Sequence, residues 1–223
     1  FLRESLPVER RREAGMRVAL SGYWQLLHDR RFVAYALVPG LSFGVTMSYV
    51  VGSPFVLQEE YGMSASQFSL TFAVIGIGIV VASQLNAALV KYHPPHLILR
   101  YASLSLLVAT SSLLAIVFTG WGGLPAFLVA LWFSTAIVFM LYPNATALML
   151  EPYGSMAGTA AAFGGAASSM LAGLISPLVG VLGGDRFAMA GVMAGAAVTA
   201  TLVLLLGTPV FRRGGPEGRR IVV

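Results

Sequence analysis

The sequence predicts an all-α membrane protein, a bundle of six transmembrane helices. Its 223 residues are 57% hydrophobic and only 10% charged, and their mean hydropathy is +0.80. A soluble domain typically carries about 25% charged residues, so this chain lacks the polar surface that a water-facing globule needs. The apolar runs are continuous rather than alternating, and they far exceed the roughly 10 residues of a membrane β-strand. Helices are therefore expected throughout.

The spans follow from the positions of the charges. Five stretches contain no Asp, Glu, Lys or Arg: 32–58, 61–90, 101–150, 152–184 and 187–211. A bilayer core about 30 Å thick needs about 20 residues of helix, so the third stretch is too long for one span. Inside it, the run GWGGLP at 120–125 is a turn signal with an interfacial aromatic residue. We therefore expect six helices, at about 32–57, 66–90, 98–119, 124–150, 156–183 and 187–211.

The basic residues predict the orientation of the bundle. With six spans, thirteen of the fourteen lysines and arginines fall on one side of the membrane, and Arg186 alone falls on the other. Because cytoplasmic segments carry an excess of Lys and Arg, both termini should be cytoplasmic. We expect a basic cytoplasmic linker at 1–31, the six-helix bundle at 32–211 and a basic cytoplasmic tail at 212–223. The partner of these basic segments should be the lipid bilayer and not nucleic acid.

Reactive side chains are scarce in the predicted spans. The chain has no cysteine, which excludes disulfides, thiolate zinc sites and thiol catalysis. The three histidines, His28, His93 and His96, fall in predicted cytoplasmic segments, so a membrane serine would have no histidine base. The nine acidic residues fall at span ends or in tails, and none is available to relay protons near the bilayer midplane. We expect no enzymatic activity, no cofactor and no metal.

The predicted spans do contain neutral polar side chains. In the first span, Ser42, Thr46, Tyr49 and Ser53 lie within roughly 20° of one line at about 100° per residue. Such a line is costly against lipid, so it should face a protein interior or a wet cavity. Tyr49 is the strongest candidate for substrate contact, because its ring combines apolar area with a hydroxyl. Asn144 and Ser168, in the fourth and fifth spans, are further cavity candidates. The structural alternative for each hydroxyl is a bond to its own helix or helix–helix contact.

Four further residues are candidates for kinks or gating. Pro54, Pro143 and Pro177 lie inside predicted spans, where each removes a backbone donor and can kink its helix. Gly158 begins a run of small residues in the fifth span, which would let a neighbouring helix approach closely.

Several stretches, taken in order, carry a family resemblance. They are FLRESLPVERR at 1–11, YVVGSPFVLQ at 49–58, SQLNA at 83–87, PNATAL at 143–148 and AGTA at 157–160. This ordered set resembles the central linker and the seventh, eighth, tenth and eleventh helices of Bcr/CflA drug:proton antiporters in the major facilitator superfamily. Three positions depart from the family: Pro94 replaces a loop glycine, His96 replaces an expected arginine, and Ser168 stands where relatives often have glutamine.

The resemblance implies the C-terminal half of a twelve-helix transporter in the bacterial inner membrane. Such a transporter exports small amphipathic drugs in exchange for protons by alternating access. The missing N-terminal six-helix half would hold the proton-coupling carboxylate, so this fragment should not transport alone. The alternatives are a self-contained six-helix channel or a membrane scaffold. An aquaporin-type channel needs two Asn-Pro-Ala turns, whereas this chain has Pro143-Asn144-Ala145 once, in a different order.

Overall fold

A computed structural model describes residues 16–211 of the chain, and the side chains of residues 21–211. Helices make up all the regular structure in this part, so the predicted all-α fold class is confirmed. The first fifteen residues of the predicted linker and the whole predicted tail at 212–223 lie outside the described residues.

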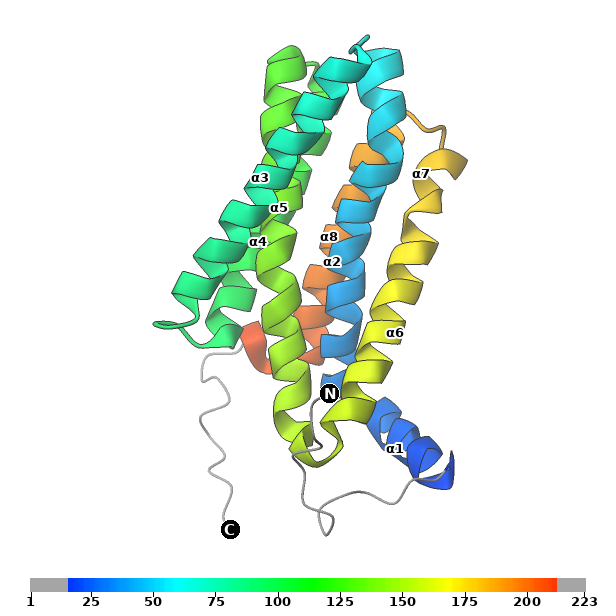
Figure 1. The fold of residues 1–223 in the computed structure, drawn as a ribbon, viewed down its shortest axis with the longest axis vertical. Coiled ribbons are helices and arrows are strands. Elements are labelled where there is room, and N and C mark those ends of the chain that lie inside the picture. Colours follow the sequence, from blue (N-terminus) through cyan, green and yellow to red (C-terminus); the bar gives the residue numbers. More distant parts are fainter. Residues whose placement is uncertain (1–15, 212–223) are drawn as a thin grey trace, which may run out of the picture.

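Long antiparallel helices run the length of the molecule (Figure 1). The turns after α2, α4 and α7 lie at one end, and the turns after α3 and α5 lie at the other, together with α1 and the last 3₁₀ turn. The bounds are α1 Met16–His28, α2 Arg30–Pro54, α3 Ala65–Leu89, α4 Pro95–Thr119, α5 Gly123–Leu150, α6 Ala157–Ile175, α7 Pro177–Val181 and α8 Arg186–Gly207. A π-helix, Phe55–Glu60, extends α2, and 3₁₀ turns cover Glu151–Met156 and Pro209–Phe211.

Five helical stretches of the described residues are long and apolar enough to cross a membrane, and one of them forms two legs of the bundle. The stretch Gly123–Val181 is helical over 59 residues without a long loop. At about 1.5 Å per residue it would measure roughly 90 Å, about three bilayer cores, if it were straight. It folds back instead at the 3₁₀ turn, where Tyr153 leaves helical geometry at φ −115° and ψ 34°. This turn separates α5 from α6, so the stretch forms two antiparallel legs of the bundle.

Polar side chains cap the N-termini of three long helices, α2, α3 and α8, where a charged or polar residue interrupts the apolar sequence. The Ser64 hydroxyl accepts from the Gln67 N–H at 3.3 Å, and the Gln67 side chain accepts from the Ser64 N–H at 2.9 Å, which forms a capping box for α3. The Asp185 carboxylate accepts from the Ala188 N–H at 2.8 Å at the start of α8. Asp29 caps α2 in the same way. These bonds satisfy backbone donors that a helix start leaves free.

The helix α2 occupies the centre of the bundle and packs against α5, α6 and α8 (Figure 1). Its contact with α6 depends on two glycines. A Cβ at Gly40 would lie 2.8 Å from the Ser168 Cα, and one at Gly44 would lie 2.7 Å from the Ile175 Cδ1. Without a hydrophobic drive between helices in lipid, such close backbone approach supplies the van der Waals packing that holds them together.

The outer leg α3 is the least buried span and is held mainly by α5. The indole of Trp132 covers Gly78, where an added Cβ would lie 2.5 Å from the ring. The same indole N–H donates to the Val74 carbonyl at 3.1 Å.

A short helix precedes the first span, where the sequence predicted only a linker. This helix, α1, packs on α2 and α6, and its Leu26 is fully buried. The ring of Tyr23 lies 6.0 Å from that of Phe163 on α6. The basic residues of this region led to the prediction of a linker. A short amphipathic helix needs only one apolar face, which is compatible with many basic residues.

Three prolines act differently in the helices that contain them. After Pro54 the helix changes from α to π over Phe55–Glu60, and α6 ends at Ile175, two residues before Pro177. Pro143 is accommodated inside α5, which stays continuous. Gly158 is exposed near the start of α6, with open space where a Cβ would be. The expected single helix at 156–183 is therefore α6 and α7, because Pro177 cannot continue the hydrogen-bond ladder.

Replacing Asp29 with alanine should lower the free energy of unfolding by about 1–2 kcal/mol, because a helix cap is lost. The carboxylate accepts from the N–H groups of Arg31 at 2.8 Å and Phe32 at 3.3 Å, and from the Tyr153 hydroxyl. Burial opposes its charge, but these bonds outweigh burial and hold the pKa of Asp29 below its usual range.

The lowered pKa sets the pH dependence of this contribution. The charged Asp29 stabilises the fold above the ordinary carboxyl pKa of about 4, and the stabilisation is lost as pH falls through the lower folded value. Melting temperatures of the native chain and of Asp29→Asn, measured from pH 7 to pH 3, should therefore converge in acid. Parallel curves would contradict the assignment.

Candidate functional site

A pocket of about 470 Å³ opens between four legs of the bundle. Helices α2, α3, α5 and α6 line it, whereas α4 and α8 contribute no lining residue. Its lining residues are Phe43, Ser83, Asn86, Val138, Phe139, Tyr142, Pro143, Ser168 and Ser169. Aromatic and neutral polar side chains thus converge on one space, which is the usual composition of a small-molecule site.

Two aromatic rings form one wall of the pocket. The rings of Phe43 on α2 and Tyr142 on α5 lie 6.3 Å apart at 64°, in edge-to-face contact. This arrangement gives a rigid apolar surface, to which the Tyr142 hydroxyl adds a polar edge.

A pair of amides lies at the polar side of the pocket, and one of them, Asn86, lines it. The Asn144 amide of α5 donates to the Asn86 side-chain oxygen of α3 at 2.6 Å and to the Met140 carbonyl at 2.7 Å. Both asparagines are buried, at 2% and 8% exposure. Both donors of the Asn144 amide are therefore used, and the pair fixes α3 against α5 beside the pocket. The lining includes no acidic or basic side chain, so it can bind through apolar contacts and neutral hydrogen bonds.

The predicted site residues fall into two groups. Ser168 lines the pocket, and Asn144 bonds to a lining residue. Ser42, Thr46, Tyr49 and Ser53 lie elsewhere, buried along α2 at 0–4% exposure and not among the lining residues. Their four hydroxyls have no hydrogen-bond partner in the protein. The Tyr49 ring stacks on Phe72 of α3, with centroids 5.4 Å apart at 24°.

Sequence reasoning missed most of the pocket wall. Phe43, Tyr142 and Ser169 carry no distinctive pattern in the sequence, because aromatic and small residues are common in all six spans. Ser83 and Asn86 are polar residues inside a predicted span, and this was a signal in the sequence. A polar side chain in lipid, above all an amide such as that of Asn86, needs a partner on another helix. Pairing the asparagines of the second and fourth spans would have identified this side of the pocket.

Charges at the opposite end of α2 from α1 form an ion pair. The backbone N–H of Arg186 donates to the Glu60 carboxylate at 2.7 Å, and the Arg186 Nε lies 3.5 Å from its other oxygen. The guanidinium also lies over the rings of Tyr61 and Phe187, at 5.9 Å and 5.3 Å. These contacts tie the end of the π-helix to the start of α8. Among the described residues, no group of three His, Asp or Glu side chains could hold a metal ion.

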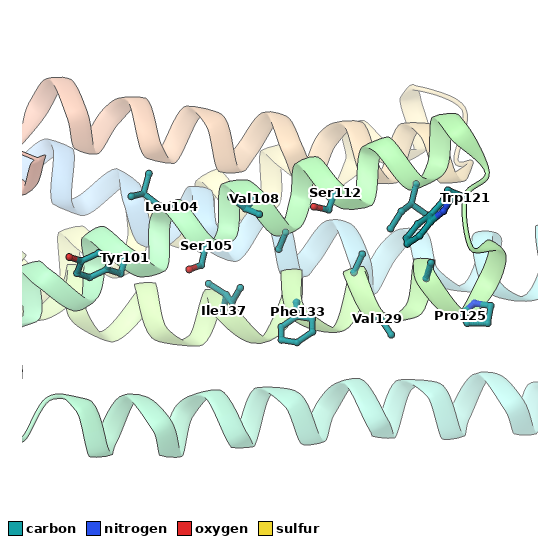
Figure 2. A pocket seen from close by; sticks show the side chains of 14 residues that line it. Tyr101, Leu104, Ser105, Val108, Ser112, Trp121, Pro125, Val129, Phe133 and Ile137 are labelled. Carbon is teal, nitrogen blue, oxygen red and sulfur yellow. The ribbon is translucent and has the colours of Figure 1, made fainter.

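A larger groove, of about 780 Å³, runs along α4 and α5 (Figure 2). Tyr101 and Trp121 lie at its two ends, and apolar side chains such as Val108 and Val129 line the space between them. Ser105 and Ser112 are its only hydroxyls besides Tyr101. Its size is greater, but its apolar lining suits lipid better than a polar ligand. The smaller pocket is therefore the candidate site.

Comparison with known proteins adds one relative. No protein-family model matches the chain. The chain is 30% identical over 201 residues to the protein named "Uncharacterized MFS-type transporter YdgK" of Bacillus subtilis strain 168. The alignment covers 90% of this chain and 50% of the relative, so the chain spans about half the length of that protein. The similarity to a transporter of the MFS type agrees with the all-helical membrane bundle described above.

Proposed function

We propose that the chain forms one six-helix half of a secondary active transporter of the Bcr/CflA type. In this proposal it exports small amphipathic molecules in exchange for protons, and the pocket between α2, α3, α5 and α6 contributes one side of the substrate cavity. The observation that carries the proposal is the convergence of aromatic rings, paired amides and serines on this pocket. The transporter relative supports the same function class.

A smooth surface beside the pocket supports a second bundle as partner. Most of the exposed residues of α6 are small: Gly158, Ala161, Ala162, Gly165, Ala166, Ser169 and Gly173. Two large side chains, Met170 and Leu174, are also exposed toward the end of the helix. A Cβ added at Gly158, Gly165 or Gly173 would have no neighbour within 4 Å. Small residues allow helices to approach closely in a membrane, and Ser169 also lines the pocket. A second six-helix half on this face would close the cavity and rock against α6.

The proton-coupling group is assigned to that second half. Coupling needs a titratable side chain within the membrane, and the pocket lining has no carboxylate, histidine or lysine. In the proposed division of labour, this chain supplies contacts to the substrate and the partner supplies the exchangeable proton.

Cells that express the chain alone should show no efflux of an amphipathic dye. Co-expression with the half of the Bacillus relative that the chain does not match should give proton-gradient-dependent efflux, once co-purification shows that the two halves assemble. Within the assembled pair, Ser169→Phe should abolish efflux because the phenyl ring fills the pocket. The matched control Ser111→Phe, on the exposed face of α4, should keep it.

Three results would contradict this function. Efflux by the purified chain alone in liposomes would refute both the half-transporter and the coupling arguments. Passage of small solutes or ions through the chain alone, without dye efflux and without a proton gradient, would instead favour the channel alternative. Equal loss of efflux in both phenylalanine variants would remove the pocket from the mechanism.

Both ends of the chain should face the cytoplasm of a bacterial inner membrane, as the positions of the basic residues predict. Because the sequence has no cysteine, single cysteines can be labelled without background. Ser66→Cys near the start of α3 should react with an impermeant maleimide from outside the cell. Tyr92→Cys in the exposed turn after α3 should react only after the membrane is opened. The reversed pattern would invert the topology.

A further inference from the structure

Arg100, on α4, is a partly buried cation that forms an ion pair with no carboxylate of residues 16–211. Its Nε is buried and has no hydrogen-bond partner, and its guanidinium carbon lies 5.6 Å from the centroid of the Phe211 ring. In the part of the chain that the structure describes, the single ion pair joins Glu60 and Arg186, at the opposite end of the bundle. Partial burial of a charge that no described carboxylate neutralises is unfavourable, so this position suits an anionic ligand.

The apolar groove on α4 and α5 begins beside this cation. Tyr101 follows Arg100 directly and lines one end of the groove, and Leu104 lines it one helical turn further on (Figure 2). Arg100 is not itself a lining residue, and its guanidinium lies over Phe211 on the turn after α8. Residues four apart share a helix face, so Arg100 lies beside the groove entrance on the Leu104 side. From Tyr101 to Trp121 the groove covers about 20 helical residues, or roughly 30 Å, which matches a bilayer core. Tyrosine and tryptophan at its two ends suit the two membrane interfaces.

We propose that this groove binds one anionic phospholipid, with the phosphate on Arg100 and an acyl chain along α4 and α5. A guanidinium presents paired N–H donors that match phosphate oxygens, and basic pockets at membrane helix ends are typical sites for anionic lipid headgroups. The groove supplies apolar contact for the chain of the same molecule. This site is separate from the pocket of the proposed function, and it does not depend on transport.

Charge favours a lipid over a second copy of the chain in this groove. A symmetric dimer would bring the same patch of both copies together, and therefore Arg100 of each copy near the other. Like charges at such a contact repel, whereas one lipid phosphate neutralises the cation.

Native mass spectrometry of the full chain tests the site. The purified chain is mixed with equal amounts of a phosphatidylglycerol and a phosphatidylethanolamine that have the same acyl chains. The chain should retain the anionic lipid preferentially, and Arg100→Gln should reduce this preference about fivefold, the effect of one basic residue at a membrane surface. Arg100→Lys should retain most of the preference. Lys91→Gln, which removes an exposed charge from the neighbouring turn, is the matched control and should change little.

A groove-filling variant tests the acyl-chain contact separately. Val129 is 57% exposed and lines the groove, so Val129→Trp should reduce retention of both lipids without changing their ratio. Circular dichroism and melting temperature confirm that each variant is folded, and Arg100→Lys keeps the test valid if Arg100→Gln unfolds. Equal effects of Lys91→Gln and Arg100→Gln, unchanged retention in Val129→Trp, or a dimer that excludes lipid would each overturn the proposal.

Discussion

Replacing Gly40 with valine should lower the free energy of unfolding by about 2–3 kcal/mol or more. A Cβ at this position would lie 2.8 Å from the Ser168 Cα and 2.9 Å from the Leu171 Cβ of α6. The first of these atoms is backbone, so the clash cannot be relieved by a side-chain rotation, and α2 and α6 must move apart. Overpacking of this kind typically costs about 1–3 kcal/mol, and a backbone contact belongs at the upper end.

The matched control is Gly165→Val, on the exposed face of α6. A Cβ there has no neighbour within 4 Å, while the intrinsic helix preference changes in the same way. Melting temperatures of both variants in detergent should differ by several degrees, with Gly40→Val the lower. Gly40→Ala should fall between Gly40→Val and the native chain. Equal shifts at positions 40 and 165 would show that helix propensity, and not the α2–α6 contact, determines the loss.

Tyr49→Ala should lower the free energy of unfolding by about 2–4 kcal/mol, because it leaves a cavity at the centre of the bundle. The Tyr49 side chain is 2% exposed and stacks on Phe72, which helps to hold the weakly buried α3. Removal of a buried ring in a soluble core costs about 3–5 kcal/mol. The lower range expected here reflects the membrane, where the displaced ring contacts lipid instead of water.

Tyr49→Phe separates packing from chemistry at the same position. The ring and its stacking remain, and the hydroxyl that is lost has no partner in the protein. Stability should therefore stay equal or rise, since an unpaired buried hydroxyl is costly. Dye efflux by the assembled pair, measured beside the melting temperature, gives a second readout. If Tyr49→Phe stops efflux without loss of stability, the hydroxyl contacts the substrate, as the sequence predicted.

The amino-acid sequence by itself determined the all-α membrane class of the protein. Lipid offers no hydrogen bonds, so backbone groups must pair within each segment, and long stretches without charge can only be helices. The same constraint identified the embedded polar residues as exceptions that need an explanation. Ser42, Thr46, Tyr49 and Ser53 are buried in the protein, which is one of the two environments expected of them.

The tertiary structure decided which of these polar residues meet at the pocket. A helix in lipid is apolar on most of its circumference, so its sequence only weakly specifies its rotation about its own axis. That rotation follows from contacts between pairs of helices: Gly40 and Gly44 against α6, and Trp132 against Gly78. These contacts turn the hydroxyl line of α2 away from the pocket lining and bring Ser168 and the Asn86–Asn144 pair to it. Close packing joins residues far apart in the chain, and for this reason periodicity within one span could not predict the pocket.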